Sequence, residues 1–155
     1  MSQHLDPTPK QTDLNSLNEN LDNIAKVDLS GLNSASSISA LYNCTGTLTE
    51  TVKYKIVGKK FVMGGRYRIT SASRTGANPG IEITLPNGYK TTATVDIGVG
   101  FAGNSDGIRY METTLVQCNA ESTTIRIRQT ETVSNFTSNA IWGVIPMIVI
   151  PITTY

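Results

Sequence analysis

Residues 81–97, which read IEITLPNGYKTTATVDI, hold two runs of alternating side chains on either side of a turn signal. Apolar residues recur at nearly every second position in both runs, which is the period of a β-strand with one buried and one solvated face. The Pro86-Asn87-Gly88 sequence between the runs is typical of a tight turn, because Asn-Gly tolerates the positive backbone angles of a short hairpin loop. The segment therefore predicts an antiparallel β-hairpin.

The same period of two extends over most of the chain from about residue 38 onwards. Further strands are predicted around 51–57, 66–70, 108–117, 123–130, 132–137 and 141–155, with long loops at 72–80 and 98–107. About eight to ten short strands, with turn signals between them and no helical segment, are typical of an antiparallel β-sandwich. We therefore expect a mainly β, jelly-roll-like sandwich.

The run IWGVIPMIVIPI, residues 141–152, is the most apolar part of the chain. It is shorter than the roughly 20 residues that span a bilayer, and two prolines interrupt it. A strand with apolar residues at both odd and even positions is usually covered on both faces. One cover would be the opposite sheet, and the second would have to be another subunit.

The first 41 residues contain no aromatic side chain, and this shift in composition divides the chain. We predict an extended leader at 1–13, a short helix at 14–27, a linker at 28–37 and the β-sandwich at 38–155. The helix would place its apolar residues in one narrow stripe of heptad a and d positions. These residues are Leu14, Leu17, Leu21 and Ile24. The stripe favours self-association in a coiled coil, with packing on the chain's own domain as the alternative.

The overall charge and the cysteines exclude several classes of partner. A net charge of +1 gives no long-range attraction for nucleic acid or an anionic membrane. The first 20 residues lack an apolar signal-peptide core, so synthesis in a cytoplasm is expected. Cys44 and Cys118 lack the spacing of a zinc site, and we expect buried free thiols, with a single disulfide bridge as the alternative.

Nothing in the sequence predicts an enzyme, a metal site or a cofactor. His4 is the only histidine, which leaves a catalytic triad or a histidine metal site unsupported. The glycine-rich loop at 98–107 lacks the spacing of a phosphate-binding loop. Asn104 and Asp106 are too few ligands for calcium, but with Arg109 or Tyr110 nearby they suit the hydroxyl groups of a sugar.

Six basic residues alternate with apolar ones on three predicted strands and could align into one basic stripe. They are Lys53, Lys55, Arg66, Arg68, Arg126 and Arg128. Tyr54 and Tyr67 fall on the opposite, inward parity, so a platform for stacking nucleic-acid bases is not expected. A solvated face that protects the sheet from edge pairing is the commoner meaning of such residues.

The polar leader, the heptad stripe, the Thr-rich β domain and the doubly covered final strand together resemble a bacteriophage fibre or spike subunit. The resemblance is to the trimeric tail-fibre, baseplate-tip or head-fibre kind, and it implies a homotrimer located in the virion. It implies that residues 1–13 anchor to another virion protein, that residues 14–27 form a stalk, and that the β heads expose loops to host-surface polysaccharide.

On this basis the candidate glycan-binding residues are Arg74, Asn78, Asn104, Asp106 and Tyr110, on the loops 72–80 and 98–107 and just beyond the second of them. Two other functions stay open. One is a purely structural capsid-decorating or connector protein without a specific ligand. The other is an intracellular β-sandwich binding module with a docked helix.

Overall fold

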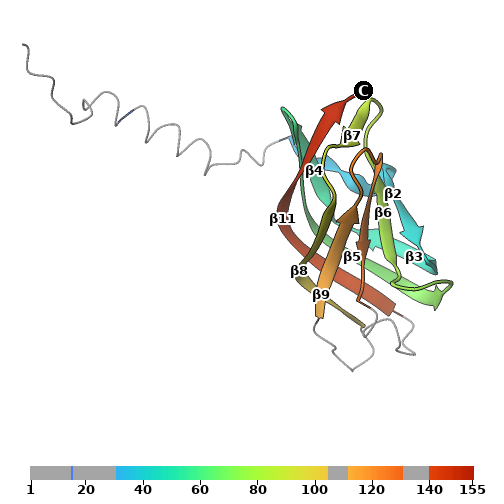
Figure 1. Ribbon diagram of the computed structural model, residues 1–155. Helices are drawn as coiled ribbons and strands as arrows, with labels where there is room; N and C mark the ends of the chain where they lie inside the picture. Colours follow the sequence, from blue (N-terminus) through green and yellow to red (C-terminus); the bar gives the residue numbers. More distant parts are fainter. Residues whose placement is uncertain (1–14, 16–30, 105–111, 131–139) are drawn as a thin grey trace, which may run out of the picture. The chain divides into compact units, whose positions relative to one another are not determined.

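The computed structural model describes Asn15 and residues 31–104, 112–130 and 140–155, which are mainly antiparallel β-structure (Figure 1). The chain divides into two compact units, Met1–Gly31 and Leu32–Tyr155. The strands of the second unit are β1 (Asn33–Ser34), β2 (Ser39–Tyr42), β3 (Cys44–Glu50), β4 (Lys53–Val57), β5 (Lys60–Arg74), β6 (Gly80–Thr84), β7 (Tyr89–Thr91), β8 (Val95–Asn104), β9 (Glu112–Cys118), β10 (Thr124–Arg128) and β11 (Ala140–Thr154). A short 3-10 helix, η1 (Ala35–Ser37), follows β1. The mainly β fold predicted from the sequence is confirmed.

The strands of the described residues form one antiparallel sheet that curls over itself as a half-barrel, where the sequence predicted two packed sheets. The order is β1-β4-β5-β11-β8-β9-β10-β6-β2, and β3 also pairs with β5 while β7 pairs with β11. The sheet stays continuous because β5 and β11 are 15 residues long and each pairs with different neighbours along its length. A register shift between Ile145 and Ile148 marks where β11 bends.

The prediction of a β-hairpin at residues 81–97 is wrong, although the turn within it is present. The Tyr89 N–H donates to the Pro86 carbonyl oxygen at 3.2 Å, and Gly88 adopts the positive φ of +89° that such a turn needs. However, β6 pairs with β10 and β2, whereas β7 pairs with β11. The turn therefore sends the chain from one part of the sheet to another.

Burial explains why β6 prefers a distant partner to the local one. Ile81 pairs with Ile127 and Ile83 pairs with Ile125, and all four side chains are fully buried. The returning segment offers Thr91 and the part-buried Tyr89 in place of isoleucines. The pairing with β10 removes more apolar surface from water, so tertiary packing overrides the turn signal.

Most of the second predicted loop is a strand, because β8 extends to Asn104. Gly100, at φ +57°, lies inside the register shift between Val99 and Ala102, where β8 passes from pairing with β9 alone to pairing with β11 as well. The predicted strand at 132–137 and the end of this loop lie outside the described residues.

The core lies on the concave side of the curled sheet, where isoleucine dominates. Its largest fully buried side chains include Tyr67, Phe61, Met63, Ile69 and Ile150. Cys44 and Cys118 are both free and buried, and burial raises the pKa of each thiol. The inward orientation predicted for Tyr67 is thus confirmed.

One face of β11 is buried and the other is exposed. Ile141, Ile145, Ile150 and Ile152 point into the core. On the opposite side Val144, Met147 and Val149 are 37%, 42% and 54% exposed, and Phe101 of β8, which pairs with Val144, is 52% exposed. Phe101, Val144, Met147 and Val149 are called the outer β11 face below. A single chain therefore supplies one of the two covers expected for this strand.

The predictions for the N-terminal part fall mostly on residues that are not described. Leu14, Leu17, Leu21 and Ile24, and the leader at 1–13, lie outside the described residues. The predicted linker at 28–37 contains β1 and η1 in its described part. No helix among the described residues is long and apolar enough to cross a membrane.

Candidate functional site

The two loops predicted to bind glycan approach the same end of the curled sheet. The first runs from the end of β5 to the start of β6, and the described part of the second is the last part of β8 (Figure 1). Gln129 connects them: its backbone carbonyl accepts from Asn78 Nδ2 at 2.9 Å, and its side-chain Nε2 donates to the Gly103 carbonyl at 3.0 Å. The described parts of the two loops are therefore linked at one end of the sheet, and binding of glycan there stays a prediction.

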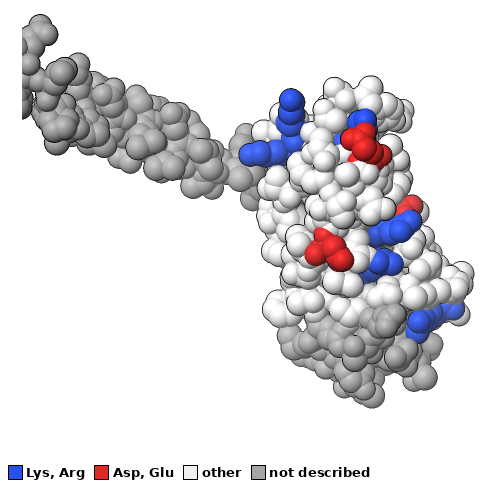
Figure 2. Space-filling model, in the orientation of Figure 1, with Lys and Arg blue, Asp and Glu red and all other residues white. Residues whose placement is uncertain are grey.

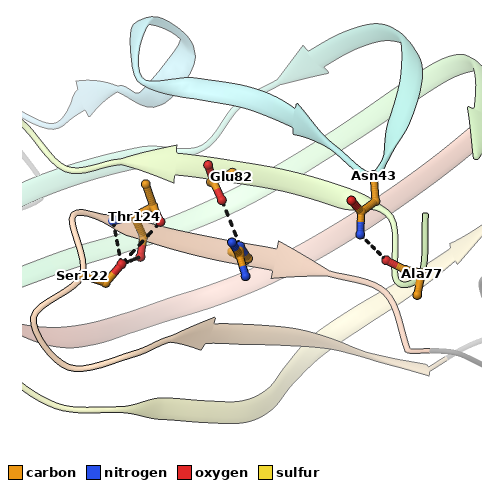
Figure 3. Close-up of polar contacts among 6 residues, drawn as sticks. Asn43, Ala77, Glu82, Ser122 and Thr124 are labelled. Carbon is orange, nitrogen blue, oxygen red and sulfur yellow. Dashed lines mark hydrogen bonds and ion pairs between the residues drawn. The ribbon is translucent and has the colours of Figure 1, made fainter. Parts of the chain in front are cut away.

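The candidate residues on the first loop hold that loop in place. Arg74 Nε donates to the Gly76 carbonyl at 2.7 Å, and Asn78 contacts Gln129 as described above. Asn43 Nδ2 donates to the Ala77 carbonyl at 2.6 Å, which ties the loop to the turn between β2 and β3 (Figure 3). These contacts fix the loop backbone, and binding of a ligand by Arg74 or Asn78 stays a prediction.

The candidates on and after the second loop are only partly within the structure. The Asn104 backbone ends β8, opposite Ile141 of β11. Asp106 and Tyr110 lie outside the described residues. A common site for these three side chains therefore stays a prediction.

A polar groove of about 310 Å³ opens on the outer side of β8, β9 and β10, and sequence reasoning missed it. Three paired residues cross its floor, with Asp96 opposite Gln117 and Gln117 opposite Arg126, and the row continues beyond the lining to Glu82, opposite Arg126. Its remaining lining residues are Thr94, Val95, Cys118, Asn119, Ser122, Thr124 and Arg128. The lining thus combines two guanidinium groups, one carboxylate, two amides and several hydroxyls.

Hydrogen bonds fix much of the groove. Gln117 Nε2 donates to Asp96 Oδ1 at 2.8 Å, and Arg126 Nε donates to Glu82 Oε2 at 2.9 Å (Figure 3). The hydrogen bond to Glu82 is also the main reason why the pKa of Arg126 is raised. The Arg126 guanidinium lies 4.7 Å from the centre of the Tyr42 ring, a cation–π distance. These contacts hold the row rigidly before any ligand arrives.

Hydrogen bonds also fix Ser122 and Thr124, which line the groove. Ser122 Oγ donates to the Thr124 carbonyl at 3.0 Å and accepts from the Thr124 N–H at 3.1 Å (Figure 3). Both hydroxyl groups are part-buried and remain close, at 3.4 Å from each other. Hydroxyls in fixed positions can both donate and accept, which suits a polar ligand.

Two polar atoms of the groove lining lack a hydrogen-bond partner among the described residues: Arg128 Nε and Gln117 Oε1. Arg128 also has no ion-pair partner there, and its guanidinium lies 5.6 Å from the centre of the Tyr42 ring. An unpaired buried polar group costs roughly 1–3 kcal/mol of stability. Both atoms are buried, so a ligand in the groove would contact the more accessible parts of these two side chains.

The six basic residues that could have aligned into one stripe lie on two separate parts of the sheet. Lys53 and Lys55 of β4 lie opposite Gly64 and Val62 of β5, and Arg66 and Arg68 follow further along β5. The two remaining residues, Arg126 and Arg128, belong to the groove on β10. Figure 2 shows basic and acidic side chains as small separate groups on an otherwise uncharged face.

The comparisons with known proteins leave the function to be inferred from the chain itself. No protein-family model, no curated protein and no solved structure matches the chain. Among the described residues there is no group of three or more histidine, cysteine, aspartate or glutamate side chains that could hold a metal ion. The groove and the loop end are therefore the candidate sites.

Glu50, at the end of β3, is a part-buried residue outside both sites whose two carboxylate oxygens are buried. Its two carboxylate oxygens have no hydrogen-bond partner among the described residues, since the Ser39 hydroxyl nearby donates its proton to the Ala35 carbonyl at 2.8 Å. Burial raises the pKa of Glu50, and the proximity of Ser39 offsets this only in part. Ionisation of Glu50 therefore opposes folding.

The change Glu50→Gln should stabilise the protein in a pH-dependent way. Below the ordinary pKa of 4.5 the carboxyl is protonated in both the folded and the unfolded chain, so the substitution should have little effect. Above that pH the unfolded chain ionises first, and the glutamine variant should gain on the order of 1 kcal/mol by neutral pH. Urea unfolding across this range measures the gain. The exposed Glu121→Gln control should gain nothing, and an equal gain at all pH values would contradict the role of the charge.

Proposed function

We propose that the chain is a subunit of a homotrimeric bacteriophage appendage, a fibre or spike that contacts host-surface glycan through its β head. In this proposal residues 1–13 attach to another virion protein and the Leu14 to Ile24 stripe forms a short three-stranded coiled coil. The heads then pack around the same axis. Three weak glycan sites on one assembly raise occupancy through avidity without tight single contacts.

The outer β11 face is the observation that carries the proposal. Val144 lies between Phe101 of β8 and Arg66 of β5, and Val149 lies beside Val62 of β5. Exposed apolar side chains that form a continuous patch on a sheet favour a protein interface. A second copy of the chain fits this face best, because the heptad stripe independently predicts self-association.

The loop end supports contact with glycan. The described parts of both predicted loops lie at one end of the sheet, where Asn78 and Gln129 hold them together. Loops fixed on a rigid β scaffold are common sites of recognition. In a trimer around one axis, three such loop clusters would face the host surface together.

Replacing Val144 and Val149 together with aspartate should convert the assembly into monomers. Six carboxylates would then enter three apolar contacts, and unpaired charges are costly to bury. Light scattering on the full chain should give three times the mass of one chain for the wild type and a single mass for the double variant. The stripe variant Leu17→Asp with Leu21→Asp, measured alongside, tests whether the stalk is needed as well.

The matched control is Ile97→Asp, because Ile97 is 43% exposed but lies on β8 away from the outer β11 face, opposite the buried Val116. This variant should keep the wild-type mass. A wild-type chain that is monomeric at micromolar concentration would contradict the proposal and favour the intracellular binding module. A trimer that binds no sugar on a glycan array would favour the purely structural connector.

A further inference from the structure

We propose that the groove on β8, β9 and β10 is a binding site for an acidic saccharide, a sugar that carries a carboxylate beside its hydroxyl groups. The proposal deepens the function inferred above, on which it rests for the general class of ligand. It assigns binding to Asp96, Gln117 and Arg128, which are not on the predicted loops. The groove volume of about 310 Å³ suits one or two sugar rings.

Arg128 supplies the anion-binding part of the site. Arg126, the other guanidinium of the groove, is already paired with Glu82, whereas Arg128 has no ion-pair partner among the described residues. Its Nε atom is unsatisfied, and Tyr42 supports the guanidinium from one side. An arginine fork binds a carboxylate through two parallel hydrogen bonds, and since Arg128 Nε is buried, a ligand carboxylate would pair with the two terminal nitrogens of the guanidinium.

Gln117 and Asp96 supply the hydroxyl-binding part. The amide nitrogen of Gln117 must face Asp96, because a carboxylate accepts hydrogen bonds, and this leaves the Oε1 atom as an acceptor without a partner. That Oε1 atom is buried, whereas Asp96 is exposed, so a sugar hydroxyl can donate to the second carboxylate oxygen of Asp96. One ligand that is both anionic and rich in hydroxyl donors therefore complements both ends of the groove.

The geometry disfavours nucleic acid as the occupant. Single-stranded nucleic acid is held by bases stacked on open aromatic rings and by several basic residues along the backbone. Tyr42 is the aromatic ring in contact with the groove arginines, and those guanidinium groups already lie over it. Asp96 and Glu82 further lower the positive potential along the row.

The test is a titration of the full chain with trigalacturonic acid, in which ligand-observed NMR measures binding. The fully methyl-esterified trisaccharide is the neutral comparison. The wild type should bind the acid, and Arg128→Gln should weaken binding about tenfold or more, because it removes charge-assisted hydrogen bonds. Methyl esterification should cause a similar loss. Arg128→Lys keeps the charge but loses the paired hydrogen bonds of the guanidinium. Its affinity for the acid should therefore fall between those of the wild type and Arg128→Gln.

Lys59→Gln is the matched control, because it removes the same charge from an exposed turn outside the groove and should leave affinity unchanged. Equal binding of the acid by wild type and Arg128→Gln would overturn the proposal, as would equal binding of the ester or tighter binding of an oligothymidine. Circular dichroism melting of each variant shows that it is folded. If the chain is a trimer but shows no binding in this titration, only the saccharide site in the groove is ruled out and the proposed appendage stands. The failure of one proposal can therefore be told from the failure of the other.

Discussion

Gly100→Ala is expected to lower the free energy of unfolding by about 3 kcal/mol or more. Gly100 has a φ of +57°, which a residue with a side chain adopts only at a cost. A Cβ atom there would lie 1.9 Å from the Val144 carbonyl oxygen and 2.9 Å from Pro146 Cδ. The oxygen belongs to the backbone of β11, so relief of this contact requires that β8 and β11 separate.

Gly58→Ala provides a matched control for this prediction. Gly58 has nearly the same φ, +58°, but nothing lies within 4 Å of its added Cβ. That variant should lose only about 1–2 kcal/mol, the cost of the backbone conformation itself. Urea unfolding measures both, and equal losses would show that the strand contact at Gly100 relaxes freely.

Gln129→Leu is expected to destabilise the protein by about 2–3 kcal/mol, although the two side chains have similar volumes. Gln129 is fully buried, and its Nε2 donates to the carbonyl oxygens of Gly103 and Trp142, at 3.0 and 3.4 Å. Leucine removes this shared donor between β8 and β11 at the loop end. We also expect faster amide hydrogen exchange around Gly103 in the variant.

The same substitution at another glutamine tests whether the effect comes from burial. Gln117 lies in the groove, is only half-buried and bonds through its side chain to Asp96. Gln117→Leu should therefore cost less than about 1 kcal/mol. If both variants lose the same stability in chemical unfolding, the link between β8 and β11 is not what Gln129 contributes.

The sequence predicted where the strands lie along the chain far better than which strands pair with each other. Alternation placed Ile81, Ile83, Ile125 and Ile127 correctly on the buried face, because period two reports burial directly. The partner of a strand depends instead on which distant apolar faces fit together. The Asn87-Gly88 turn therefore formed as predicted while the hairpin did not.

The same limit explains which sites the sequence could suggest. Loop residues such as Arg74 and Asn78 stand out because they are polar and lie between strands. Asp96, Gln117 and Arg126 lie on three different strands, and only the register of β8, β9 and β10 aligns them in one row. Alternation along each strand predicts that each of these side chains points outward. That the three side chains lie close together depends on the order of the strands in the sheet, which alternation does not reveal.

The position of β11 has a consequence for how the chain folds. β11 lies between β5 and β8 in the sheet, yet it follows every other described strand in the sequence. During synthesis β5 and β8 therefore present open edges until residues 140–154 have left the ribosome. Pairings over such long separations form slowly, and open edges promote aggregation. We therefore expect the sheet to close only after residues 140–154 have been synthesised, with β11 completing it from within.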